Sequence, residues 1–153
     1  MKQVITITKL LKITPDVIRV TASKPEGISF VPGQAADISI NMPGWEDKLR
    51  AFTFTSLPTD DYLEFTIKTY PDRKGVTHQL LTLQIGDKLI IHGIFGDIHY
   101  KGEGIFIAGG AGIPLLSRFL NRSKRKIKLG ITSYSSLIKH GRILLMKSFF
   151  KSF

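Results

Sequence analysis

Hydrophobic and polar residues alternate in short runs over the first hundred residues. The runs span 3–13, 17–23, 36–42, 50–56, 63–70 and 87–95. Alternation with a period of two is typical of strands that bury one face. Turn-forming sequences such as Thr14-Pro15-Asp16 and Val31-Pro32-Gly33 separate the runs. The pattern predicts a mainly β fold, a six-stranded antiparallel barrel, because closure removes the exposed edges of a sheet.

Two segments depart from this alternation. Residues 75–81 begin at a glycine and lack a strand pattern, so we expect a short helix between two strands. After Gly104 an apolar run leads into a glycine-rich turn, and a helix is expected to begin near Pro114. This order is the opening of a βαβ unit. We therefore predict a barrel domain at 1–101 and an α/β domain at 102–153.

Composition narrows the class of protein. The chain has 153 residues, of which 42% are hydrophobic, and no apolar run is long enough to span a membrane. The N-terminus lacks the uninterrupted apolar stretch of a secretory signal, so we expect a cytoplasmic protein with no membrane partner. There are no cysteines, so redox chemistry would need an organic cofactor instead of a disulfide or a cysteine-bound iron–sulfur cluster.

The net charge of +10 is confined to one end of the chain. Residues 1–110 contain twelve Lys or Arg and twelve Asp or Glu, whereas residues 111–153 contain ten Lys or Arg and no acid. A nucleic-acid-binding domain usually displays its basic residues on a folded face, and this is an abrupt change along the chain. We therefore expect no nucleic-acid partner.

Three stretches carry residues suited to a phosphorylated, ring-containing ligand. In RAFTFTS, Arg50 suits phosphate, Phe52 offers a flat apolar surface and Thr53 a small hydroxyl. In KGVTHQL, residues 75–77 open the expected helix, where free N–H groups attract anions. In AGGAG, residues 108–112 join a strand to a helix, as in a dinucleotide-binding turn, although no GxGxxG pattern is present. Each signal is weak by itself.

The four histidines do not form a metal site or a triad in the sequence. His78, His92, His99 and His140 are scattered, and no two of them have the i, i+4 spacing of a helical ligand pair. We expect structural or solvated roles for them and no bound metal.

Taken in order, five motifs make the chain resemble the ferredoxin/flavodoxin–NADP+ reductase family, the FAD-binding FR-type oxidoreductases. The motifs are Phe30-Val31-Pro32-Gly33-Gln34, Arg50-Ala51-Phe52-Thr53, Gly75 to Leu80, Gly86 to Gly96, and Phe106 to Ile113. The resemblance implies a Greek-key FAD-binding barrel, followed by a domain for NAD(P)H. It implies hydride transfer from NAD(P)H to FAD and electron delivery to ferredoxin, flavodoxin or a similar acceptor.

The resemblance also implies roles for the matched positions. Arg50 would pair with the FAD pyrophosphate, Phe52 would lie against the isoalloxazine beside Ala51, and Thr53 would sit near the atom that receives hydride. Backbone groups of Ile67, Lys68 and Thr69 would hold the pyrimidine edge, and those of Gly75, Val76 and Thr77 the phosphates. Gly109, Gly110, Ala111 and Gly112 would form the nucleotide loop. Phe52 replaces the family's usual tyrosine and so lacks one hydroxyl hydrogen bond, worth about 0.5 to 1.5 kcal/mol.

The resemblance weakens after Ile113. The family's Gly-Ile-Thr-Pro is here Gly112-Ile113-Pro114, and about forty residues follow where relatives have roughly a hundred. Codons for residues 130–153 can be chosen so that another reading frame encodes an apolar strand and an acid-containing helix. We therefore expect a truncated or frameshifted NAD(P) domain, impaired NAD(P)H turnover, and self-association through uncovered apolar surface.

Two alternatives stay open from the sequence. One is an FAD-binding subunit that needs a partner to supply the nucleotide domain. The other is a small β-barrel module that binds nucleic acid or an anionic surface through its basic end. Flavin absorbance and salt-sensitive nucleic-acid retardation would distinguish this second alternative from a reductase.

Overall fold

The computed structural model describes residues 2–98, 105–109 and 143–147. The chain divides into two compact units, Met1–His99 and Tyr100–Phe153, and each is described by itself. The predicted domain boundary after residue 101 stays a prediction.

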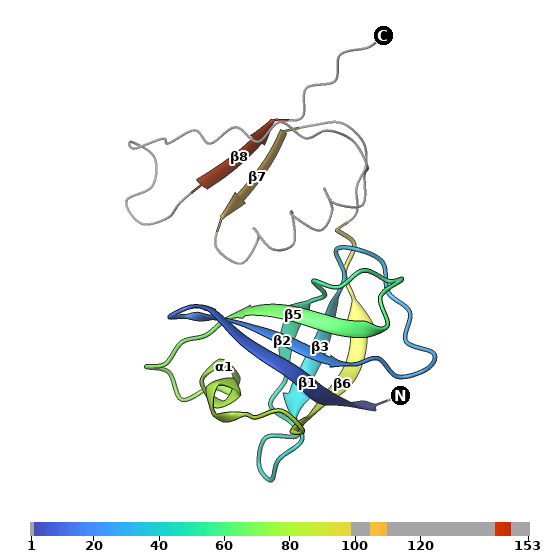
Figure 1. Cartoon of the computed structure of the whole chain (residues 1–153), viewed down its shortest axis with the longest axis vertical. Coiled ribbons are helices and arrows are strands. Elements are labelled where there is room, and N and C mark those ends of the chain that lie inside the picture. The colour runs from blue at the N-terminus through green and yellow to red at the C-terminus, as the bar shows by residue number, and fades with distance from the viewer. Residues whose placement is uncertain (1, 99–104, 110–142, 148–153) are drawn as a thin grey trace. The chain divides into compact units, whose positions relative to one another are not determined.

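The first unit contains six strands and two short helical turns (Figure 1). The strands are β1 (Gln3–Thr14), β2 (Val17–Ser23), β3 (Ala35–Ile40), β4 (Arg50–Thr53), β5 (Tyr62–Lys68) and β6 (Lys88–Phe95). Each lies within one or two residues of a predicted run, except that β4 ends three residues early. The expected helix is α1 (Val76–Gln79), followed by the 3-10 turn η1 (Leu80–Thr82). The mainly β fold class is confirmed.

The six strands form one antiparallel sheet in the order β4-β3-β6-β1-β2-β5. Strand β6 lies between β3 and β1, and β5 returns beside β2, which makes the arrangement a Greek key. The end strands meet where Phe54, just after β4, pairs with Phe65 of β5. The amide of Thr55 donates to the carbonyl of Glu64 at 2.7 Å. The sheet is thereby closed into a barrel at this point.

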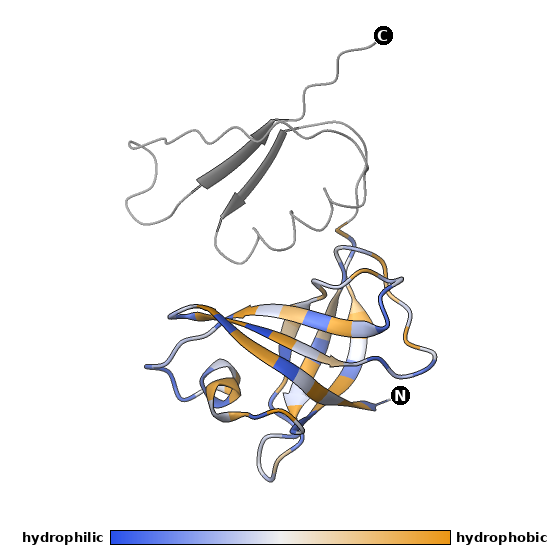
Figure 2. Ribbon diagram, viewed as in Figure 1, coloured by the Kyte–Doolittle hydropathy of each residue, from blue (hydrophilic) through white to orange (hydrophobic). Residues whose placement is uncertain are grey.

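The alternation of hydrophobic and polar residues along the strands produces the hydrophobic core of the barrel (Figure 2). Alternate residues of each strand point inward and are almost fully buried, including Ile5, Ile7, Val20, Leu63 and Phe65. The helical turns add Val76 and Leu80 to the same cluster. Burial of apolar side chains on this scale is the main stabilising contribution to the barrel.

The second unit contains two described strands, β7 (Ile105–Gly109) and β8 (Ile143–Lys147), which pair antiparallel. The apolar strand expected after Gly104 is confirmed as β7. The glycine-rich turn and the helix expected near Pro114 lie outside the described residues, so the α/β character of this unit stays a prediction. The sequence analysis did not predict β8, which lies in the acid-free end of the chain.

Candidate functional site

The barrel has a seam between β4 and β5. Continuing the register of the Phe54–Phe65 pairing places Phe52 level with Ile67 and Ala51 level with Lys68. Among the described residues, however, Phe54–Phe65 is the single strand pairing between the β4 segment and β5. We define the seam as Arg50–Thr53 of β4 and residues 66–69 at the end of β5. It is the place where the barrel is closed at one end and unpaired at the other.

Backbone groups of β5 face the seam at every second residue. The amide of Thr69 donates to the carbonyl of Asp16 at 2.7 Å, in line with the β2–β5 register. Hydrogen-bonded and non-hydrogen-bonded pairs alternate in an antiparallel ladder, so Ile67 also directs its backbone groups toward β2. Those of Thr66 and Lys68 therefore point toward β4.

The same argument applies to β4. The amide of Phe54 donates to the carbonyl of Gln34 at 3.1 Å, so Phe52 and Arg50 direct their backbone groups toward β3. Ala51 and Thr53 then direct theirs toward β5. The N–H and C=O groups of Ala51 and of Lys68 consequently point into the unpaired part of the seam, where no strand pairing satisfies them.

The three side chains predicted to hold a ligand are placed differently along β4. Arg50 is exposed, and its guanidinium donates to the carbonyl of Leu49 at 2.9 Å. In the described part of the chain no carboxylate pairs with it. Thr53 is half-buried on the outer face, whereas Phe52 packs in the core and is 8% exposed. Arg50 and Thr53 are therefore accessible, and Phe52 presents little more than an edge.

A polar cluster secures the closed end of the seam. Thr55 donates from its hydroxyl to Glu64 at 3.0 Å, and the amide of Glu64 donates to the Ser56 hydroxyl at 3.1 Å. The Nε of Arg19 lies 3.8 Å from the same carboxylate. Glu64 is buried, so this ion pair and these hydrogen bonds compensate its loss of hydration. The sequence analysis missed the cluster, although an acid in the otherwise apolar LEFTI stretch was a signal for it.

The turn before β2 anchors the open end of the seam. The amide and hydroxyl of Thr69 both donate to the carbonyl of Asp16, at 2.7 and 3.1 Å. The carboxylate of Asp16 accepts from the Thr14 hydroxyl at 2.8 Å and lies 3.5 Å from the Lys68 ammonium. The Thr14 hydrogen bond, with a further contribution from Lys68, lowers the pKa of Asp16. Both donor groups of Thr69 are therefore engaged by the Asp16 turn.

The predicted phosphate-binding segment follows directly. Gly75 and Thr77 are half-buried and Val76 is buried. The amides of His78 and Gln79 already donate to the carbonyl of Gly75. The amides of Val76 and Thr77 precede the first amide that donates within the helix, that of His78, so they are the donors that α1 leaves free.

Basic and aromatic groups lie beside this segment. The ring of Tyr70 is exposed and has the Arg73 guanidinium 4.9 Å and the Lys68 ammonium 5.9 Å from its centroid. His78 bonds through Nδ1 to the carbonyl of Pro71 at 2.6 Å, which ties α1 to the preceding loop. This gives His78 a structural role.

The motif at residues 30–34 and the motif at residues 86–96 lie against each other next to the seam. Gly96 has φ +116°, and a Cβ at this position would lie 3.4 Å from Cα of Gln34. Gly33, in the same motif as Gln34, has φ +103°. The glycines of these two motifs thus permit a close approach of backbones that holds β3 in register beside β6.

The remaining predicted positions are only partly described. Gly109 ends β7, and Gly110, Ala111 and Gly112 lie outside the described residues, as do His99 and His140. His92 bonds to the buried Ser39 hydroxyl at 2.7 Å. Within residues 2–98 no three His, Asp or Glu side chains gather to ligate a metal. The described segments also contain no helix of the length and hydrophobicity needed to cross a membrane.

Comparison with known proteins identifies the family to which this chain belongs. Residues 5–100 match the model of the oxidoreductase FAD-binding domain. The chain is 33% identical over 126 residues to the reductase component of propane 2-monooxygenase from Rhodococcus jostii (strain RHA1), covering 77% of this chain and 33% of that protein. The corresponding reductase component from Gordonia sp. (strain TY-5) is 34% identical over 132 residues, covering 80% of this chain and 37% of the relative. The chain spans about a third of the length of these curated relatives.

Solved structures share the fold. The ferredoxin reductase in carbazole 1,9a-dioxygenase superposes with a TM-score of 0.66 at 22% identity. The match covers 80% of this chain and 38% of that one. At this level of identity the likeness concerns the fold alone.

Proposed function

The chain belongs to the family of oxidoreductase FAD-binding domains, and on that premise we propose that its barrel holds FAD in the seam between β4 and β5. The proposal is supported by the direction of the Ala51 and Lys68 backbone groups, which point into the seam beyond the last pairing at Phe54–Phe65. Unpaired backbone donors and acceptors in a row fit the polar edge of a flavin ring, which offers both kinds of group. The residues present therefore fit this cofactor.

The ring edge is held by backbone groups at alternate positions. Lys68 supplies an N–H and a C=O on the edge of β5 that faces β4. Ile67 contributes apolar packing from the inner face, and Thr69 holds the end of β5 against the Asp16 turn. The contribution of Ala51 comes from the opposite side of the seam.

The phosphates are held by charge and by free amides. Arg50 is exposed and has no carboxylate partner among the described residues, so its guanidinium is available for bidentate contact with a pyrophosphate. Gly75 permits a close backbone approach, since nothing lies within 4 Å of the position of an added Cβ. Val76 and Thr77 offer free amides, and Thr77 adds a hydroxyl.

The remaining residues of the motif orient the reacting ring. FAD, when bound, supplies the redox chemistry, since it accepts a hydride and can release electrons singly. Thr53 is half-buried at the seam and is the residue for which we propose a catalytic role through its hydroxyl. Phe52 supports the ring from the core side by its exposed edge.

We propose a reductase reaction in which NAD(P)H is the electron donor. The loop Gly109, Gly110, Ala111 and Gly112 is its proposed contact in this chain. The acceptor is an electron-carrying protein such as a ferredoxin or flavodoxin, or an oxygenase component, because the relatives are reductase components of oxygenases. The cytoplasm is the proposed location.

Titration of the purified full-length chain with FAD tests the cofactor. We expect saturable binding with a perturbed flavin spectrum, and weaker binding of riboflavin because it lacks the pyrophosphate. A chain that remains colourless at saturating FAD, or that binds riboflavin equally well, would exclude the proposed cradle. Loss of the yellow colour on anaerobic addition of NADH or NADPH then tests the electron donor.

A further inference from the structure

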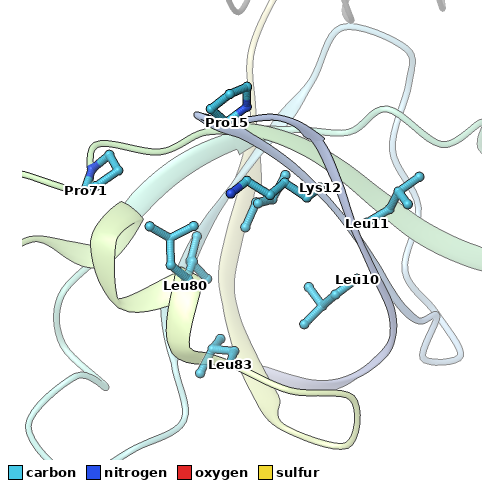
Figure 3. A pocket seen from close by; sticks show the side chains of 9 residues that line it. Leu10, Leu11, Lys12, Pro15, Pro71, Leu80 and Leu83 are labelled. Carbon is cyan, nitrogen blue, oxygen red and sulfur yellow. The ribbon is translucent and has the colours of Figure 1, made fainter.

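A pocket separate from the seam opens at the α1 end of the barrel, between the distal part of β1 and the segment that follows β5 (Figure 3). Its volume is about 480 Å³, within the range of roughly 300 to 1,000 Å³ usual for small-molecule sites. Its lining is aliphatic except for one ammonium: Leu10, Leu11, Lys12, Pro15, Ile18, Pro71, Leu80, Leu81 and Leu83. The sequence analysis did not identify it.

The residues at the base of the pocket are buried, and those at its rim are exposed and apolar. Ile18, Leu80 and Leu83 are buried and belong to the barrel core. Leu11 and Leu81 are 44% and 38% exposed at the rim. Two large aliphatic side chains that remain in water beside a cavity provide apolar surface that a ligand can cover.

Lys12 lies near the end of β1, where the residues of both faces are exposed, and it stands at the mouth of the pocket. Ile7 points into the core, and the register shift after Ile7 inverts the alternation of β1, so that Leu10 packs against the core. Lys12 follows Leu10 by two residues and therefore lies on the same face of the strand. Figure 3 shows its side chain extending across the opening toward Leu80.

The ammonium of Lys12 is available to a ligand. Among residues 2–98 it forms no hydrogen bond or ion pair, whereas Lys68 pairs with Asp16 and Lys24 donates to two carbonyls. The four-carbon stem of Lys12 lies along the apolar lining and carries the charge to the mouth. The pocket thus combines an aliphatic interior with a single cation at its opening.

From this combination we propose that the pocket binds an aliphatic carboxylate, such as a medium-chain fatty acid. The alkyl chain lies over Ile18, Leu80 and Leu83, and the carboxylate pairs with the ammonium of Lys12. Alkyl burial supplies affinity without direction, and the charge pair fixes which end of the ligand faces outward. A neutral alkane or alcohol of the same length makes the first contact but not the second.

Calorimetric titration of the full-length chain with decanoate and with decanol tests the proposal. We expect decanoate to bind with a defined stoichiometry and about tenfold more tightly than decanol, since a hydrogen bond to a charged group contributes roughly this factor. Lys12→Met keeps the apolar stem and removes the charge, so it should abolish the preference for decanoate while leaving decanol binding unchanged. The matched control Lys9→Met removes an exposed charge outside the pocket and should keep the wild-type preference.

Three results would overturn the proposal. These are equal affinity of the wild-type chain for the two ligands, unchanged decanoate binding by Lys12→Met, and no saturable binding of decanoate below its micelle-forming concentration. In each case Lys12 would be a charge that protects the β1–β2 hairpin from edge-to-edge pairing. Circular dichroism and thermal melting of each variant establish that it is folded. The readout does not depend on FAD, so its outcome is independent of the proposed function.

Discussion

The ring of Phe30 stacks on the ring of Phe54, with centroids 4.0 Å apart and planes inclined by 15°. Phe54 lies 5.1 Å from Phe65 in turn, and Phe54 and Phe65 are the residues whose pairing closes the barrel. One aromatic column therefore joins the loop before β3, the end of β4 and the centre of β5. The closed end of the seam is held by this packing.

Replacement of Phe54 by alanine should destabilise the barrel by about 3 to 5 kcal/mol, as for other buried phenylalanines. The side chain is 1% exposed and has neighbours on both sides, so its removal leaves a cavity that the strands cannot fill. Urea unfolding followed by circular dichroism measures the change. Phe95→Ala is the matched control, because Phe95 is 45% exposed and its loss should cost far less. Equal losses from the two variants would contradict the role of the column.

Arg50→Gln should weaken FAD binding about tenfold or more with little effect on folding. The guanidinium is exposed and bonds only to the neighbouring Leu49 carbonyl, so stability depends little on it. A charge-assisted contact with a pyrophosphate contributes about 1.5 to 3 kcal/mol. Fluorescence titration with FAD provides the measurement. Lys9→Gln removes the same charge from an exposed part of β1, and a comparable loss of affinity in that variant would mean that net charge alone is responsible.

The strands were predictable from the sequence, whereas the directions of backbone groups were not. Alternation located all six barrel strands, because burial of one face imposes a period of two on the side chains. The motifs predicted Arg50 and the segment around Thr77 as site residues. The distinction between Lys68 and Thr69 required the register with β2, since two adjacent residues direct their amides to opposite sides of a strand. The tertiary pairing that fixes this register has no local signature.

The burial of Phe52 and the partners of Glu64 depend on the topology in a similar way. Phe52 was predicted to lie against the isoalloxazine, which stays a prediction, and its position inside the barrel depends on contacts from β3 and from the core. Glu64 lies in an apolar run and is satisfied by Thr55 and Arg19, which are far from it in sequence. Side chains that depend on partners from other strands cannot be assigned before the topology is known.

Asp16→Asn should remove part of the acid sensitivity of the fold. The Thr14 hydroxyl, and then Lys68, lower the pKa of Asp16. A group with a depressed folded pKa contributes stability above its unfolded pKa of about 4 and loses this contribution as the pH falls through the folded pKa. The wild-type chain should therefore exceed the variant in urea midpoint at pH 6, and the difference should shrink at pH 3. A difference that does not change with pH would assign the effect to the Asp16 turn alone.

Gly96→Ala should destabilise the barrel by about 1 to 3 kcal/mol, the usual cost of a non-glycine residue in a sparsely populated backbone conformation. Its φ is +116°, and the added Cβ would also lie 3.4 Å from Cα of Gln34. Thermal unfolding of the variant measures the cost. Gly93→Ala is the control in the adjoining strand β6, since Gly93 has nothing within 4 Å of the added Cβ and no left-handed φ. A smaller loss for Gly96→Ala than for Gly93→Ala would contradict this account.

Lys68→Pro compared with Lys68→Ala tests the backbone of the seam directly. Both changes remove the ion pair with Asp16, which is half-exposed and contributes little to stability. Only proline removes the N–H, and the alternation of β5 directs that N–H toward β4 instead of toward the ladder with β2. The β2–β5 ladder therefore keeps its hydrogen bonds in both variants. We expect Lys68→Ala to bind FAD nearly as well as the wild-type chain and Lys68→Pro to bind it about tenfold more weakly. Equal affinity of the two variants would mean that the amide of Lys68 does not contact the flavin, and the seam would then hold the cofactor through its side chains.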